Sequence, residues 1–99
     1  MAKSFFVYMM SNARHGTIYV GVTSDLRARV WQHKTHAFED SFTARYDLSC
    51  LVWFEAHESA EAAIVREKRL KEWRRGWKVD LIEEANPRWD DLWEQVASF

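Results

Sequence analysis

The sequence predicts an α+β fold, an α/β sandwich in which a small three-stranded antiparallel sheet is flanked by helices in the order ββαβαα, with an extra C-terminal helix. Three observations lead to this class. A chain of 99 residues has the length of one domain. Two apolar runs near its start are separated by a polar loop, which is typical of a β-hairpin. Longer segments that open with helix-capping residues follow, and a third apolar run interrupts them.

The first two strands form the predicted hairpin. Residues 4–10 and 17–22 are rich in aromatic and β-branched side chains, and residues 11–16 between them are polar and contain a glycine. With the loop centred on that polar stretch, Tyr8 becomes the direct cross-strand partner of Tyr19. Their Cβ atoms are then about 5 Å apart on one face of the sheet.

The middle of the chain predicts one helix and one strand. Thr23-Ser24-Asp25 supplies N-cap chemistry for a helix that runs to about Lys34. Residues 35–47 are polar and aromatic without a clear period, so we expect them to be irregular. Residues 48–56 form a third strand, and their continuous apolar character predicts a central position in the sheet.

Helices complete the chain. Ser59 is the expected N-cap of a long helix over residues 60–75, which Gly76 ends or kinks before a short helix at 77–84. An Asn-Pro break then precedes an acidic amphipathic helix at about 88–97. We expect one domain over residues 1–99, with its core at about 4–84. Three apolar residues on one face of the last helix are expected to pack on that core: Trp89, Leu92 and Trp93.

Composition excludes several classes of protein. Cys50 is the single cysteine, so an internal disulfide framework and a cysteine-based zinc site are both ruled out, and its apolar surroundings indicate a buried, inert thiol. No apolar stretch approaches the roughly 18 residues of a membrane span. The start of the chain does not resemble a signal peptide. We expect a cytoplasmic protein that does not contact a membrane.

Charge is distributed unevenly along the chain. The net charge is −1, but residues 1–79 carry 13 basic and 9 acidic side chains, whereas residues 80–99 carry 1 and 6. The run 66–78 has seven cations and two carboxylates. Such a local positive field binds phosphates even when the whole chain is neutral, although a solvated helix face gives the same pattern.

Glu67 interrupts an apolar helix stripe. At 100° per residue it falls near the middle of the face that is expected to be buried, where the pattern favours a leucine. A buried carboxylate costs several kcal/mol unless it is paired or bound to a cation. It therefore meets an internal arginine or opens onto a metal site. The apolar members of this stripe are Ala60, Ala63, Ile64 and Leu70.

These residues, in this order, resemble the GIY-YIG nuclease superfamily, and within it the small stand-alone bacterial proteins related to the nuclease domain of excinuclease C. Residues 6–8 (Phe-Val-Tyr) stand where the family has Gly-Ile-Tyr, and residues 19–21 (Tyr-Val-Gly) stand at Tyr-Ile-Gly. Arg29 matches the catalytic arginine, and His33 matches the His-or-Tyr position one turn later. Glu67 matches the single metal-binding glutamate.

The resemblance implies a metal-dependent endonuclease that hydrolyses phosphodiester bonds in DNA, with structure-directed or weak specificity and a role in repair or recombination. Glu67 would hold one Mg²⁺ or Mn²⁺. Arg29 would contact a non-bridging phosphate oxygen. Tyr8 or Tyr19 would take the proton from water, and His33 would relay that proton or orient the tyrosine.

Partners follow from the same resemblance. DNA is favoured over RNA, and a protein partner or homodimer stays open. A nucleic-acid-binding module of this fold with little or no cleavage is the alternative, and an interaction protein built on the tryptophans explains neither Glu67 nor the basic run. Asn86 stands near a functional asparagine of larger family members, at a different spacing from Glu67. The cations expected to contact nucleic acid are Arg27, Lys34, Arg45, Lys68, Lys71, Arg74 and Arg75.

Overall fold

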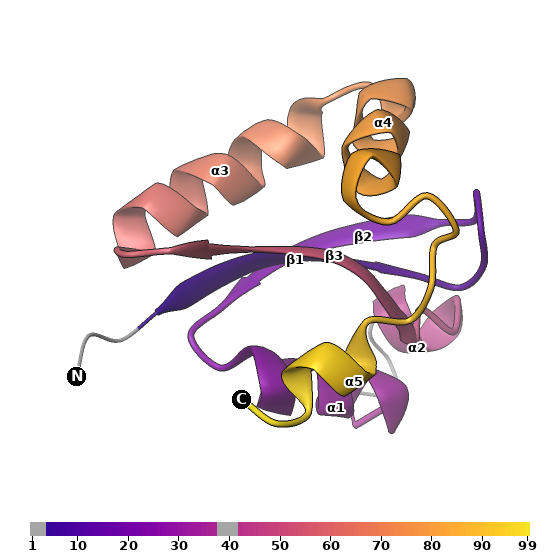
Figure 1. The fold of residues 1–99 in the computed structure, drawn as a ribbon, viewed down its shortest axis with the longest axis horizontal. Coiled ribbons are helices and arrows are strands. Elements are labelled where there is room, and N and C mark those ends of the chain that lie inside the picture. Colours follow the sequence, from indigo (N-terminus) through magenta and orange to yellow (C-terminus); the bar gives the residue numbers. More distant parts are fainter. Residues whose placement is uncertain (1–3, 38–41) are drawn as a thin grey trace.

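A three-stranded antiparallel sheet separates two layers of helices, which confirms the predicted fold class and the ββαβαα order (Figure 1). The structure is a computed structural model and describes residues 4–37 and 42–99. Helices α3 and α4 cover one face of the sheet, and α1, α2 and α5 lie on the other (Figure 1). In chain order the elements are β1 (Phe5–Ser11), β2 (Ile18–Thr23), α1 (Leu26–Lys34), α2 (Phe42–Arg45), β3 (Cys50–His57), α3 (Ala60–Glu72), α4 (Arg75–Ala85) and α5 (Trp93–Val96).

The strand order is β2-β1-β3, so β1 is central and the predicted central position of β3 is wrong. The apolar run of β3 has another cause. Its residues Leu51, Val52 and Trp53 are buried because helices cover both faces. The C-terminal segment also covers the outer edge, where the Leu92 amide donates to the Leu51 carbonyl (2.8 Å) and the Asn86 side chain donates to the Val52 carbonyl (3.0 Å). These hydrogen bonds replace those of a fourth strand.

The hairpin register differs from the prediction by two residues. Tyr8 pairs with Gly21, and Tyr19 pairs with Met10, so the two tyrosines are diagonal rather than direct neighbours. The loop keeps six residues but lies one position later, at 12–17 rather than 11–16, and the Asn12 side chain closes it by accepting a hydrogen bond from the Thr17 amide (3.1 Å). Both rings still lie on the same face, with centroids 6.2 Å apart.

Gly21 is required because the ring of Tyr8 lies against its Cα. A Cβ at this position would lie 2.5 Å from Tyr8 Cζ and Oη, and Tyr8 is fully buried and hydrogen-bonded to His33. We expect Gly21→Ala to lower the free energy of unfolding by about 1–3 kcal/mol in urea titrations. Gly76→Ala is the matched control: the described atoms leave space for its Cβ, and its helical site predicts no loss. Equal midpoints for Gly21→Ala and the wild type would contradict the close approach.

Helix α3 begins as predicted, but the boundary between α3 and α4 falls earlier than expected, and α4 begins at Arg75 rather than at residue 77. Ser59 caps α3 by accepting from the Ala62 amide (3.1 Å). The helix ends at Glu72 rather than Arg75, and Gly76 lies in the first turn of α4. The break falls at Trp73, whose extended backbone (ψ 147°) lets its half-buried ring pack on the core and under the Arg66 guanidinium (5.4 Å). Tertiary packing of one tryptophan, rather than a glycine, ends the helix.

The lower layer holds two further differences. Asp25 caps α1 as predicted. The stretch expected to be irregular contains the short helix α2, and residues 38–41 lie outside the described residues. The helix predicted at about 88–97 is shorter in the structure and covers only α5 (Trp93–Val96). Asp91 Oδ1 accepts hydrogen bonds from the Leu51 and Trp93 amides, which holds the segment before α5 in a non-helical conformation.

Trp89, Leu92 and Trp93 do not share one helix face, contrary to the prediction. Trp89 packs into the cluster between the sheet and α3–α4, whereas Leu92 and Trp93 pack against the cluster beside α1. The segment that carries them therefore crosses the edge of the sheet and joins both layers. Among the described residues, no helix has the length and apolar character needed to cross a membrane.

Candidate active site

Four of the five predicted catalytic side chains come together on the α1 face of the sheet. Strand alternation places Tyr8 and Tyr19 on this face, and α1 presents Arg29 and His33 one turn apart. Tyr8 Oη and His33 Nε2 are joined by a buried hydrogen bond of 2.8 Å. The ring centroids of Tyr19 and His33 are 5.6 Å apart. The strands and α1 thus build one polar cluster inside an apolar layer.

Burial keeps the two hydrogen-bonded members of this cluster uncharged at neutral pH. Loss of solvent, and then the neighbouring Tyr19, raises the pKa of Tyr8 well above its ordinary value, although the Arg29 guanidinium acts in the opposite direction. Loss of solvent and the charge of Arg29 lower the pKa of His33 to about 4. Tyr8 is therefore a phenol, and His33 is a neutral imidazole that donates through one nitrogen and accepts through the other.

Thr43 belongs to the cluster and was missed in the sequence. Its Oγ1 lies 3.0 Å from His33 Nδ1, and the threonine is 4% exposed on the short helix α2. Together with Tyr8 it engages both ring nitrogens of His33 and so fixes the ring orientation. This contact was not predictable, because no local sequence spacing relates Thr43 to a histidine ten residues earlier.

The lowered pKa of His33 predicts acid sensitivity of the fold. The unfolded chain binds a proton at this histidine near pH 6.5, whereas the folded chain binds it only near pH 4. The free energy of unfolding is therefore unaffected by His33 above pH 6.5, and it falls between pH 6.5 and pH 4, where only the unfolded chain is protonated. We expect a loss of roughly 3 kcal/mol over the window. Urea titrations at several pH values measure it. The slope should flatten in His33→Gln and persist in the control His36→Gln; equal slopes in all three proteins would exclude His33 as the source.

Glu67 lies on the other layer, on α3. Its side chain is 14% exposed, and its described ion-pair partner is Lys71, with Oε1 and Nζ 3.3 Å apart, rather than an internal arginine. The stripe predicted around it is only partly buried: Ala63 and Leu70 are enclosed, but Ile64 is 42% exposed. Glu67 therefore sits at the margin of the helix face that packs on the sheet.

This margin follows the outer edge of β2. Ile64 lines a cavity together with Val22 and Thr23, which fixes the level of α3 against the end of β2. The helix runs antiparallel to this strand (Figure 1). Glu67 is one turn further along, about 4.5 Å by helical rise, which corresponds to one or two strand residues. This brings Glu67 to the stretch of β2 around Gly21, whose opposite face carries the tyrosine cluster.

The chemistry of Glu67 fits a loosely held divalent cation rather than a closed metal cage. In residues 4–37 and 42–99, no three His, Cys, Asp or Glu side chains form a cluster that is able to hold a metal. Mg²⁺ commonly binds one or two carboxylates and takes its other ligands from water and substrate phosphate. A mostly buried carboxylate, held only by an exposed lysine among the described residues, is suited to that mode.

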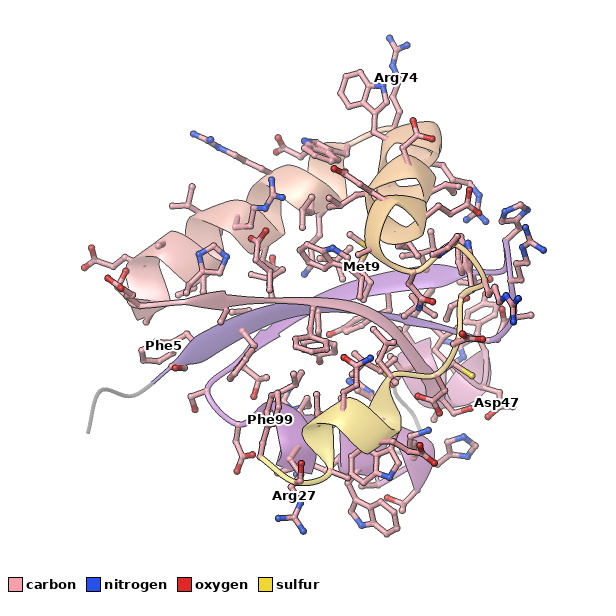
Figure 2. All side chains as sticks on the ribbon, in the orientation of Figure 1. Phe5, Met9, Arg27, Asp47, Arg74 and Phe99 are labelled. Atoms are coloured by element: carbon pink, nitrogen blue, oxygen red, sulfur yellow. The ribbon has the colours of Figure 1, made fainter. Side chains whose placement is uncertain are left out.

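The predicted nucleic-acid contacts do not share one surface. Arg27 and Arg74 lie at opposite ends of the molecule (Figure 2). Three others have structural partners: Lys34 bonds the Ser49 carbonyl and pairs with Asp91, Arg75 donates to the His15 and Gly16 carbonyls, and Lys71 pairs with Glu67. Arg45 and Lys68 are exposed.

Asn86 serves the fold. Its Nδ2 donates to the Val52 carbonyl (3.0 Å) and the Asp90 carbonyl (2.9 Å), and its Oδ1 accepts from the Asp90 amide (3.0 Å). The residue is 5% exposed at the end of α4. Because the donors and the acceptor of its amide are used inside the chain, Asn86 holds the C-terminal segment against β3.

One comparison with known proteins identifies a family. The GIY-YIG catalytic domain matches residues 4–80, which contain the tyrosine cluster and Glu67. Searches of curated proteins and of solved structures found no significant match. The finer relation to excinuclease C stays a prediction. Because the matched region spans most of the 99 residues, the chain belongs to the GIY-YIG family of nucleases.

Proposed function

We propose that this protein is a metal-dependent endonuclease that hydrolyses phosphodiester bonds in DNA, with structure-directed or weak sequence specificity, and that it acts in the cytoplasm in repair or recombination. DNA is the proposed substrate in preference to RNA. The observation that carries the proposal is the assembly of Tyr8, Tyr19, Arg29 and His33 on the α1 face of the sheet. It is supported by the place of Glu67 on α3, one turn beyond Ile64, which packs at the end of β2. Homodimer formation and a protein partner stay predictions.

The two tyrosines have different roles in this proposal. Tyr8 is fully buried, whereas Tyr19 is partly exposed and able to meet water and substrate. Tyr19 is therefore the proposed proton acceptor. Tyr8 and His33 orient it and carry the proton onward. Deprotonating a phenol at neutral pH costs about 4 kcal/mol, and the positive charge of Arg29 offsets part of this by favouring the phenolate.

Arg29 and Glu67 supply the remaining functions. The planar guanidinium of Arg29 binds a non-bridging phosphate oxygen in a fork that lysine does not reproduce. Glu67 would hold Mg²⁺ or Mn²⁺. When bound, such an ion supplies Lewis-acid polarisation of the phosphate.

The alternative is a nucleic-acid-binding module of this fold with little or no cleavage. The lowered pKa of His33 favours it, because burial makes this imidazole a weak base at neutral pH. The position of Glu67 disfavours it, since a carboxylate beside a polyanion weakens simple binding.

Cleavage assays on labelled single-stranded, nicked and branched DNA, and on RNA, test the proposal, with Mg²⁺ or Mn²⁺ against EDTA at low salt. We expect metal-dependent cutting of DNA. Tyr19→Phe should lower the rate by roughly 10²–10⁴-fold, and Tyr8→Phe should lower it less. Tyr46→Phe is the control, because this tyrosine is 49% exposed outside the cluster. DNA binding without cutting under all conditions would establish the binding module, and a larger loss in Tyr8→Phe would reverse the two roles.

A further inference from the structure

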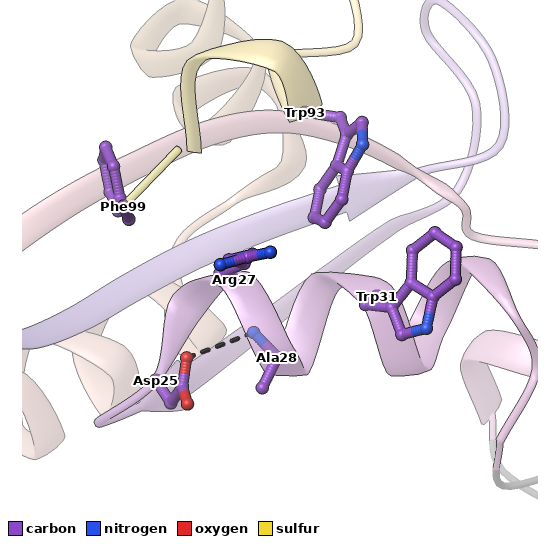
Figure 3. A pocket seen from close by; sticks show the side chains of 6 residues that line it. All are labelled: Asp25, Arg27, Ala28, Trp31, Trp93 and Phe99. Carbon is purple, nitrogen blue, oxygen red and sulfur yellow. Dashed lines mark hydrogen bonds between the residues drawn. The ribbon is translucent and has the colours of Figure 1, made fainter. Parts of the chain in front are cut away.

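A cavity lies on the flank of α1 that faces away from Arg29. Residues two apart on a helix point about 160° away from each other, so Arg27 and Trp31 face α5, whereas Arg29 and His33 face the tyrosine cluster. The cavity between α1 and the C-terminal residues has a volume of about 500 Å³ (Figure 3). Its lining consists of Asp25, Arg27, Ala28, Trp31, Trp93 and Phe99.

Flat aromatic surfaces and one cation form the walls of this cavity. Trp31 and Trp93 are stacked, with centroids 5.8 Å apart and planes at 29°. Trp31 and Phe99 are 55% and 58% exposed, so their ring faces are open to a ligand in the cavity. Arg27 lies between Phe99 and Trp93 (Figure 3). The ammonium of Lys34 lies 5.9 Å from the Trp93 ring centroid, but it is paired with Asp91, so the cation of the cavity lining is Arg27.

This combination selects one class of ligand. A cationic ligand would be repelled by Arg27. An apolar side chain would remove water from Arg27 and Asp25 without replacing its hydrogen bonds. A nucleotide suits the aromatic rings, the Arg27 guanidinium and the Asp25 carboxylate together. Its base stacks on the rings, its phosphate pairs with the guanidinium, and an exocyclic amine of the base donates to the carboxylate. The volume also suits one nucleotide.

We propose that this cavity, the base pocket, holds an unpaired nucleotide of a DNA strand. Nucleic acid as the ligand class rests on the proposed function. Because α1 carries the base pocket on one flank and Arg29 on the other, a strand that crosses this helix reaches both. The preferred substrates are then those that combine duplex with unpaired nucleotides, such as flaps and branched junctions.

Binding of a short fluorescent single strand, measured by anisotropy in EDTA at low salt, tests the base pocket without cleavage. Trp31→Ala should weaken binding roughly tenfold, and Trp31→Phe should retain most of the affinity. Arg27→Ala should weaken binding and reduce the salt slope by about one. The matched control is Trp77→Ala, because Trp77 is 53% exposed on the other layer of the fold.

The outcomes separate this inference from the proposed function. Unchanged single-strand affinity in Trp31→Ala, or a loss only in Trp77→Ala, would overturn the base pocket even if the wild type cuts DNA. A loss in Trp31→Ala supports the pocket even if no substrate is cut. Crosslinking of a bromouracil-containing strand to Trp31, Trp93 or Phe99 would support it independently, and crosslinks confined to α3 and α4 would overturn it.

Discussion

Replacing Arg29 by alanine is expected to lower the rate of DNA cleavage by about three orders of magnitude, because the phosphate loses its nearest fixed positive charge as negative charge develops. The loss should appear mainly in kcat, since this charge matters most in the transition state. Arg29→Lys should restore little activity, because lysine keeps the charge but not the planar fork. Single-turnover cleavage of the preferred substrate measures both variants.

A second measurement shows whether Arg29 occupies the cluster. Its charge lowers the pKa of His33 and, against the effect of burial, that of Tyr8. In Arg29→Ala the His33 pKa should therefore rise from about 4 but stay below its ordinary value, since burial persists. In Arg29→Lys the His33 pKa should stay near its wild-type value, because the positive charge is kept. A histidine titration followed by NMR resolves the two cases. Unchanged titration in Arg29→Ala would place the guanidinium outside the cluster, whatever the activity.

The face of the sheet or helix on which each cluster side chain lies was predictable from the sequence, although the register of the hairpin was not. The predicted register was wrong by two residues, yet Tyr8 and Tyr19 share a face in both pairings, because strand side chains alternate with a period of two. Helical periodicity likewise brought Arg29 and His33 to one flank. Regular local geometry therefore predicted that each pair shares one face, even where the loop that sets the pairing was misjudged. The resemblance to the GIY-YIG nucleases implied that the two pairs belong to one site.

Features set by long-range contacts were not predictable. Thr43 reaches His33 through tertiary structure, and the sequence spacing carries no trace of that hydrogen bond. Helix α3 ends where Trp73 packs on the core. The predicted final helix is shortened because Asp91 accepts from the Leu51 amide, and because Asn86 donates to the Val52 carbonyl and accepts from the Asp90 amide. In each case one side chain outweighs a local propensity of a few tenths of a kcal/mol per residue.

Replacing Glu67 by glutamine is expected to abolish metal-stimulated cleavage, a loss of about three orders of magnitude or more, since the ion supplies several kcal/mol of charge stabilisation. The side chain keeps its shape, and Lys71 is 51% exposed, so the free energy of unfolding should change by less than about 0.5 kcal/mol. DNA binding in EDTA should be retained or strengthened, because one negative charge beside the phosphates disappears. Glu72→Gln on the same helix is the control.

Binding of paramagnetic Mn²⁺, followed by NMR, shows whether a variant loses activity because it no longer binds the ion or because its remaining groups are misplaced. In the wild type, paramagnetic broadening of amide signals should centre on Glu67 and extend to Gly21 and its neighbours in β2, because helix and strand are level there. The broadening should vanish in Glu67→Gln and persist in Arg29→Ala. If broadening vanishes but cleavage survives, the reaction does not use an ion at this carboxylate. If broadening persists without Glu67, the ion has other ligands, and the link between α3 and the tyrosine cluster across β2 is wrong.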